Sequence, residues 1–214
     1  MGTSSRRPIV TKIKRILDTP DLNLDQAVTS ISQSIMNDLP DSLHARHRTR
    51  YFDSTMLNRA IGVGVSAARN LNNSSYFSQI GISVPDFSNQ RTVQDFIEAI
   101  IEHEEEQGEL EEAVHGALRQ GLIASVQQEM DNREGFFISE FFTNLIQTLL
   151  EALSADAILE RFGPIPPEEM DARFRLFAES YVRENLQTQA TRCLQGEISI
   201  TDLVASVLAT FRLA

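Results

Sequence analysis

Residues 102–112 form the most strongly charged stretch of the chain, with acidic side chains at seven of eleven positions. Glu112 and His115 have the Glu-x-x-His spacing that places two metal-binding groups on one helix face, and His103 could add a third ligand. A carboxylate-bridged di-iron bundle needs this motif twice, and the sequence has it once. We therefore expect no metal and no cofactor. We interpret the stretch as an acidic partner-binding surface made of Glu102, Glu104, Glu105, Glu106, Glu109, Glu111 and Glu112.

Two clusters of basic residues lie in the N-terminal quarter of the chain. They could bind phosphates or an acidic protein surface, or they could pair internally with the acids of 102–112. Tyr51 and Phe52 follow the second cluster, but two aromatic residues beside a basic run are weak evidence for base stacking. We favour protein contacts or internal pairing over nucleic acid. The first cluster is Arg6, Arg7, Lys12, Lys14 and Arg15, and the second is Arg46, Arg48 and Arg50.

Nucleophilic catalysis finds no support in the sequence. Cys193 has no histidine near it in sequence and lies beside Leu194 at a predicted helix end, which is typical of a packed thiol. No Gly-x-Ser-x-Gly elbow and no phosphate-binding loop is present. The run from Gly62 to Val65 lacks the third glycine and the preceding strand of a dinucleotide-binding fingerprint. We therefore expect that the protein is not an enzyme.

The basic residues are almost all arginine. Of nineteen, only Lys12 and Lys14 are lysines, although lysine is normally among the commonest residues. Arginine could be favoured for bidentate contacts at interfaces, lysine could be avoided as a modification target, or the bias could be lineage-specific usage without function. The net charge of −11 argues against free nucleic acid as a partner for the surface as a whole.

The bulk composition is that of an ordinary globular protein. With 214 residues, 42% apolar and 23% charged, the chain can bury one sizeable core. One cysteine excludes an intramolecular disulfide. No apolar run approaches the roughly 20 residues of a membrane span, and the N-terminus lacks the apolar stretch of a secretory signal. We expect a soluble intracellular protein, cytoplasmic by default.

Apolar residues recur at helical spacing along most of the chain. The helix over 136–161 is apolar nearly all round, which predicts a central position in the core. Gly62 and Gly64 indicate that their helix lies close against a neighbour. Residues 72–91 are predicted to form a packed-down loop, with room for a short strand. Helices are expected over 24–39, 54–71, from Thr92, from Leu110 to about Met130, over 136–161 after a boundary at Gly135, over 167–194, and from Thr201, with a short basic helix or turn over 41–50.

These patterns predict an all-α, single-domain bundle of about eight helices. A helical core over 1–162 would carry a C-terminal helical hairpin over 163–214. The leading functional hypothesis is a non-catalytic interaction or scaffold subunit that docks to protein partners in a larger assembly. The alternative is a nucleic-acid-associated subunit of a ribonucleoprotein or viral assembly, whose N-terminal basic clusters face the phosphates.

Overall fold

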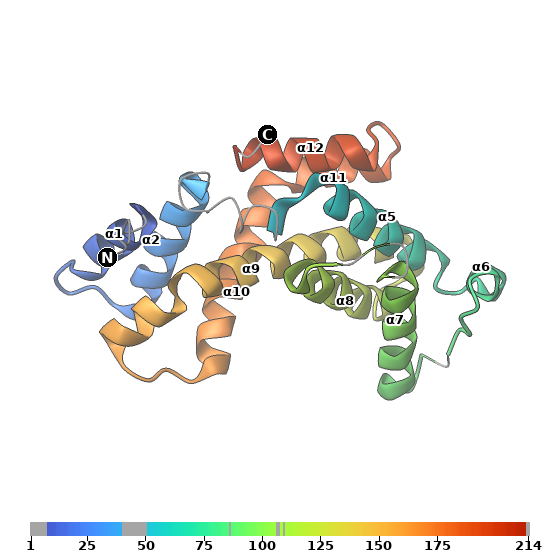
Figure 1. The fold of residues 1–214 in the computed structure, drawn as a ribbon, viewed down its shortest axis with the longest axis horizontal. Coiled ribbons are helices and arrows are strands. Elements are labelled where there is room, and N and C mark those ends of the chain that lie inside the picture. The colour runs from blue at the N-terminus through green and yellow to red at the C-terminus, as the bar shows by residue number, and fades with distance from the viewer. Residues whose placement is uncertain (1–7, 40–50, 86, 106–107, 109, 213–214) are drawn as a thin grey trace, which may run out of the picture.

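The computed structural model describes residues 8–39, 51–85, 87–105, 108 and 110–212. These residues form ten α-helices and one short 3-10 turn, and no strand occurs among them, which confirms the all-α prediction (Figure 1). The helices are α1 (Pro8–Leu17), α2 (Leu24–Asn37), α5 (Ser54–Asn70), α6 (Ser74–Gln79), α7 (Gln90–Glu105), α8 (Glu112–Val126), α9 (Arg133–Phe162), α10 (Pro167–Asn185), α11 (Gln187–Leu194) and α12 (Ile200–Thr210).

Helix α9 crosses the middle of the molecule (Figure 1). Its 30 residues span about 45 Å. Apolar side chains on several of its faces are completely buried, including Phe137, Phe141, Leu145 and Leu149. Helices α8, α10 and α5 pack directly on it. The prediction that this segment is the central core helix is therefore confirmed.

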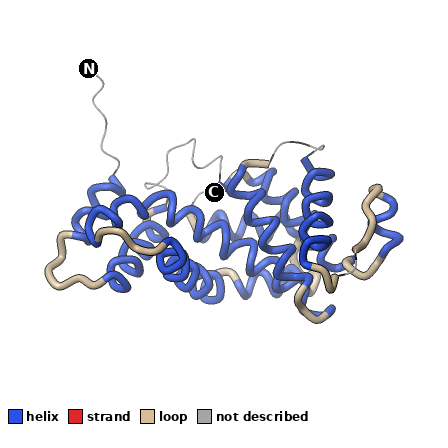
Figure 2. The backbone as a smooth tube through the Cα atoms, turned by 90° about the horizontal axis from the view of Figure 1, so that it is seen from below, coloured by secondary structure: helices blue, strands red, loops and turns tan. Residues whose placement is uncertain are grey.

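The remaining helices gather around the two ends of α9 (Figures 1 and 2). At its C-terminal end, α1 and α2 pack against each other, and α10 folds back across α9 to contact α2. At its N-terminal end lie α5, α7 and α8, with α6 outermost. The C-terminal α11 and α12 contact each other and cover α9 and α5 respectively. Helix α10 thus links the two ends of the molecule.

Local sequence accounts for the best-defined helix starts. Asn23 accepts a hydrogen bond from the backbone of Gln26, whose side chain bonds back to the backbone of Asn23, so α2 begins with a capping box. Ser199 and Asp202 make the same arrangement at α12. Pro167 occupies the first turn of α10, where a missing N–H costs nothing.

Several predicted boundaries were wrong. Helix α1 was not predicted, although Ile9, Ile13 and Leu17 recur at helical spacing and are buried. The helix expected over 167–194 is divided at Leu186 into α10 and α11. Gly135 lies inside α9 instead of before it.

The start of α7 also differs from the prediction. The helix begins at Gln90 and not at Thr92, because Asn89 supplies the cap: its side-chain oxygen accepts a hydrogen bond of 3.0 Å from the backbone N–H of Arg91. The hydroxyl of Thr92 donates to the carbonyl of Asn89 at 2.9 Å and so reinforces the same turn.

The connection between α5 and α7 is packed down, as the sequence indicated. It contains the short helix α6, whose Phe77 is fully buried with its ring centroid 4.9 Å from that of Phe96. The ring centroid of Phe87 also lies near that of Phe96, at 5.8 Å. No strand occurs in the described part of this connection. Aromatic contacts, and not a strand, anchor the described part of this connection to α7.

Gly64 allows α5 and α9 to approach closely. A Cβ atom built on Gly64 would lie 1.8 Å from Cζ of Phe137, so no larger residue fits while that ring keeps its place. Gly62, two residues earlier, has no atom within 4 Å of such a Cβ. The predicted close packing of this helix is therefore correct for Gly64 and not for Gly62.

Candidate docking groove

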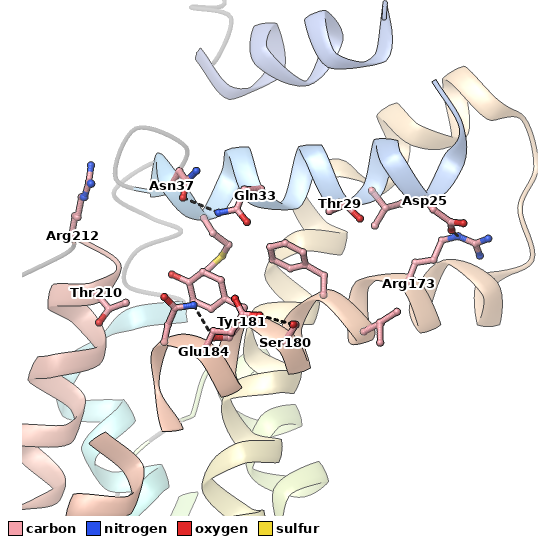
Figure 3. Close-up of a pocket in the computed structure, with 15 residues that line it drawn as sticks. Asp25, Thr29, Gln33, Asn37, Arg173, Ser180, Tyr181, Glu184, Thr210 and Arg212 are labelled. Carbon is pink, nitrogen blue, oxygen red and sulfur yellow. Dashed lines mark hydrogen bonds and ion pairs between the residues drawn. The ribbon is translucent and has the colours of Figure 1, made fainter. Parts of the chain in front are cut away.

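A groove of about 620 Å³ runs between α2 and α10 and ends beside the C-terminus of α12 (Figure 3). The lining residues of α2 extend from Asp25 to Asn37, a stretch of thirteen residues that rises about 18 Å along the helix. The opposite wall is α10, from Arg173 to Asn185, and Thr210 and Arg212 close one end. The groove therefore has the length of about three helical turns.

The floor of the groove is apolar and aromatic. The ring of Tyr181 stacks on Phe177 at 6.2 Å and on Phe211 at 6.1 Å, with 27° between the planes in each pair. Val28 and Met36 of α2 contribute aliphatic atoms and are buried. Burial raises the pKa of Tyr181 above its ordinary value. The stack connects α10 to the end of α12.

Leu176 stands at the rim of this groove with 70% of its surface exposed. Among the large apolar side chains of the described residues, it is the most exposed. The facing rim, on α2, carries Thr29, Gln33 and Asn37, which are uncharged and spaced one turn apart. Gln33 donates a hydrogen bond of 2.9 Å to Asn37. An apolar side chain on one rim thus faces a row of amide and hydroxyl groups on the other.

The two ends of the groove differ in charge. At one end, Arg173 is held by Asp25 at 2.6 Å and by Glu169 at 3.0 Å (Figure 3). At the other end lies Arg212, which is exposed and has a left-handed backbone with φ of 55°. No acid among the described residues forms an ion pair with Arg212. Within the described residues, the arginine at one end of the groove, Arg173, is therefore ion-paired, and the one at the other end, Arg212, is not.

The acidic stretch predicted to bind a partner is only partly exposed. Glu102, Glu111 and Glu112 are exposed and Glu105 is half-buried, whereas Glu106 and Glu109 lie outside the described residues. Glu104 is 7% exposed and accepts a hydrogen bond of 2.7 Å from Nε of Arg59. Glu104 is therefore an internal ion-pair partner in this fold. Its helix position next to exposed acids gave no sign of this, because Arg59 lies 45 residues away.

Arg59 fastens the C-terminal end of α7 to α5. In addition to the bond with the Glu104 carboxylate, Nη2 of Arg59 donates to the backbone carbonyls of Glu104 and Gly108, at 3.1 and 2.6 Å. A planar guanidinium can make these three bonds at once, and a lysine ammonium cannot reproduce their geometry. At this position, arginine is required by internal structure.

We expect Arg59→Lys to lower the free energy of unfolding by about 1–3 kcal/mol, because buried acceptors lose their donor. The measurement is urea unfolding followed by circular dichroism. Arg183→Lys is the matched control, since Arg183 is exposed and its one hydrogen-bond partner among the described residues is Ser180, and it should change stability by less than about 0.5 kcal/mol. Equal effects of the two substitutions would contradict the assigned role of Arg59.

The predicted basic clusters fall largely outside the structure. Arg6, Arg7, Arg46, Arg48 and Arg50 lie outside the described residues. Of the rest, Lys12 forms an ion pair with Asp38, while Lys14 and Arg15 are exposed in the last turn of α1.

The aromatic residues beside the second basic cluster are not available to a base. Tyr51 is 2% exposed and Phe52 is 6% exposed, and the Phe52 ring packs against Phe211 at 5.1 Å. A base can stack only on an exposed ring face. Neither ring therefore presents an exposed face for base stacking.

Glu112 and His115 line a second hollow, of about 530 Å³, between α8 and α9. Glu151 and Arg119 lie in the same hollow, and Nε2 of His115 is buried without a hydrogen-bond partner among the described residues. Across the described part of the chain, no three His, Cys, Asp or Glu side chains come close enough to hold a metal ion. His103 does not line this hollow.

We expect Glu151→Gln to stabilise the protein at neutral pH. Burial raises the pKa of Glu151. A hydrogen bond of 2.8 Å that Gln147 donates lowers the pKa, but by less than burial raises it. Below the ordinary pKa of glutamate, folded and unfolded chains both hold the proton. As pH rises through the raised pKa, the folded chain must ionise a partly buried carboxyl and loses stability.

The gain at neutral pH should be under about 1 kcal/mol, because the side chain is only partly buried, and it should vanish near pH 4. Melting temperatures of both proteins at the two pH values provide the measurement. Glu160→Gln on the same helix, at an exposed position, is the control and should show no such gain. A gain that persists at pH 4 would rule out ionisation as its cause.

Cys193 is half-buried on α11. Burial, followed by the nearby charges of Asp202 and Glu134, raises the pKa of its thiol. A raised pKa leaves less thiolate, which is the reactive form. The thiol is therefore packed and poorly suited to nucleophilic attack, in agreement with its sequence context.

The chain matches no protein-family model, and no curated protein and no solved structure is significantly similar to it. Within the described residues, no helix combines the length and the apolar composition needed to cross a membrane. The functional assignment therefore rests on the geometry of this fold.

No pattern in the sequence alone revealed the groove. Phe174, Phe177, Ala178 and Tyr181 indicate the buried face of α10, and the signal for the groove was the apolar residue outside that stripe, Leu176. A single out-of-phase leucine is common on protein surfaces. Only the packing of α2 beside α10 places Leu176 at the rim of a groove.

Proposed function

We propose that this protein is a non-catalytic helical interaction subunit that docks a partner protein in the groove between α2 and α10. The observation that carries the proposal is Leu176, 70% exposed above an aromatic floor. Leu176 lines the same groove as Phe177 and Tyr181, and an apolar surface rimmed by polar residues favours a partner that covers it. The expected occupant is an amphipathic helix of the partner.

The shape of the groove favours a helix over an extended chain. Its walls are two helices, so no sheet edge among the lining residues offers backbone groups to an extended peptide. Its length of about 18 Å accepts roughly three turns, whose apolar side chains at positions i, i+3 and i+4 would pack on Leu176, Phe177 and Tyr181. The row of Thr29, Gln33 and Asn37 would bond polar groups along one edge. Arg212 would receive an acidic side chain at one end.

The test places a photo-reactive phenylalanine analogue at position 176 in cells that produce the protein. Position 159 is the matched control, because Leu159 is also an exposed leucine, at the end of α9 and outside the groove. We expect one protein to cross-link from position 176 and not from 159, through a peptide with helical apolar spacing. The same protein should cross-link from position 33 on the opposite rim.

A second measurement uses the substitution Leu176→Asp. The exposed position should keep the stability within about 1 kcal/mol of the wild-type value, while recovery of the cross-linked partner falls by about fivefold or more. Equal cross-linking from 176 and 159 would exclude the groove as the docking site. Cross-linking to nucleic acid would favour the alternative of a nucleic-acid-associated subunit.

A further inference from the structure

Another hollow, of about 470 Å³, lies between the start of α9 and α11. It shares no lining residue with the groove between α2 and α10. Phe136, Ser139 and Glu140 of α9 form one wall, and Gln187 and Leu194 of α11 form the other. It is therefore a separate surface, to be tested independently of the proposed function.

Phe136 supplies an exposed aromatic ring at this hollow. It is 42% exposed, whereas its neighbours Phe137 and Ile138 are fully buried in the core. Leu194 lies beside it and covers Gly135, with its Cδ1 3.6 Å from the place of a Cβ on that glycine. Phe136 and Leu194 together form an apolar contact site that nothing in the described chain covers completely.

The charges around this apolar site are acidic. Asp131, Glu134 and Glu140 line the hollow, and no basic residue is among its lining residues. Arg69 and Arg175 hold Glu134 and Glu140 from outside, with contacts of 2.8 to 2.9 Å.

Asp131 is the acid of this hollow that remains available. It is exposed, and no described residue forms an ion pair or a hydrogen bond with its carboxylate. Asn132, Ser139 and Gln187 add neutral hydrogen-bonding groups around it. The net charge of −11 would also steer a basic partner toward the molecule.

We propose that this hollow is a second docking surface, which binds a basic segment of a partner protein. An apolar side chain of the segment packs on Phe136 and Leu194, and an adjacent arginine or lysine pairs with Asp131. Electrostatic complementarity selects the sign of the partner, and the exposed phenyl ring supplies the apolar contact area.

The test is fluorescence anisotropy with two labelled synthetic helices of about four turns. Both carry leucine at every third or fourth position, and the remaining positions are arginine in one peptide and glutamate in the other. Each is titrated with the wild-type protein and with Phe136→Ser and Asp131→Asn. The controls are Leu159→Ser and Asp156→Asn, exposed positions near the opposite end of the same helix.

We expect the arginine peptide to bind at this hollow, whereas any binding of the glutamate peptide, which could occupy the groove between α2 and α10, should not change with Phe136→Ser. Phe136→Ser and Asp131→Asn should each weaken binding by about fivefold or more, while the two controls stay within about twofold of wild type. Equal weakening by the control substitutions, or loss with Asp131→Asn alone, would reveal non-specific charge attraction and overturn the proposal. Glutamate-peptide binding that Phe136→Ser weakens equally, or no binding of the arginine peptide, would also overturn it. Circular dichroism verifies that each variant is folded.

Discussion

Gly64→Ala should destabilise the protein by about 1–3 kcal/mol, although alanine is the better helix former. The added Cβ would lie 1.8 Å from Cζ of Phe137, so the ring must leave its position in the core. Phe137 has little room to move, because it also packs against Gly121 and against Phe141, whose ring centroid is 5.9 Å away. Urea unfolding of wild type and variant measures the loss.

Two further variants separate this steric effect from helix propensity. Gly62→Ala lies on the same helix with open space around the new Cβ, so it should stabilise by about 0.5–1 kcal/mol. Phe137→Leu removes the clashing ring atoms, so the double variant with Gly64→Ala should be less destabilised than the sum of the two single changes. Strict additivity would show that Gly64 does not constrain α5 against α9.

Leu145→Ala and Leu149→Ala should each cost about 2–5 kcal/mol of unfolding free energy. Both side chains are completely buried in α9, which contacts helices from every part of the fold. Each substitution removes three buried carbon atoms and so loses the free energy of burying them. It also leaves a cavity that neighbouring helices cannot fill without moving. Denaturant midpoints at constant slope measure the loss.

Leu159→Ala tests the same chemistry on the same helix at a position that is 37% exposed. It should cost less than about 1 kcal/mol, because the site already contacts water and leaves no closed cavity. Losses below about 1 kcal/mol at both Leu145 and Leu149 would show that α9 is peripheral.

Arginine has internal roles in this fold that lysine could not fill in the same geometry. Arg59 makes three bonds to α7 and its end, and Arg69 makes two bonds to the carboxylate of Glu134. Arg119 and Arg133 are half-buried, and they donate hydrogen bonds to Glu98 and to the backbone carbonyl of Gln128. Part of the preference for arginine therefore has a structural reason.

The helical architecture could be predicted because helix periodicity is a local property. Apolar residues at i, i+3 and i+4 report the buried face of a helix, whatever it packs against. This was sufficient for α2, α5 and α9, and the apolar character of α9 on nearly all sides placed it at the centre. Boundaries that depend on one cap or one break, such as those at Asn89 and Leu186, were missed.

The sequence by itself determined the class of fold and its central helix, whereas the structure decided which of Gly62 and Gly64 is crowded. The tertiary structure alone decided which polar groups are buried and which apolar groups are exposed. Glu104 has the sequence context of a surface acid, but Arg59, 45 residues away, lies beside it and pairs with it. Leu176 lines a groove only because α2 packs beside α10. The reason is that burial and grooves depend on contacts between distant segments, and periodicity along one helix carries no information about its neighbour.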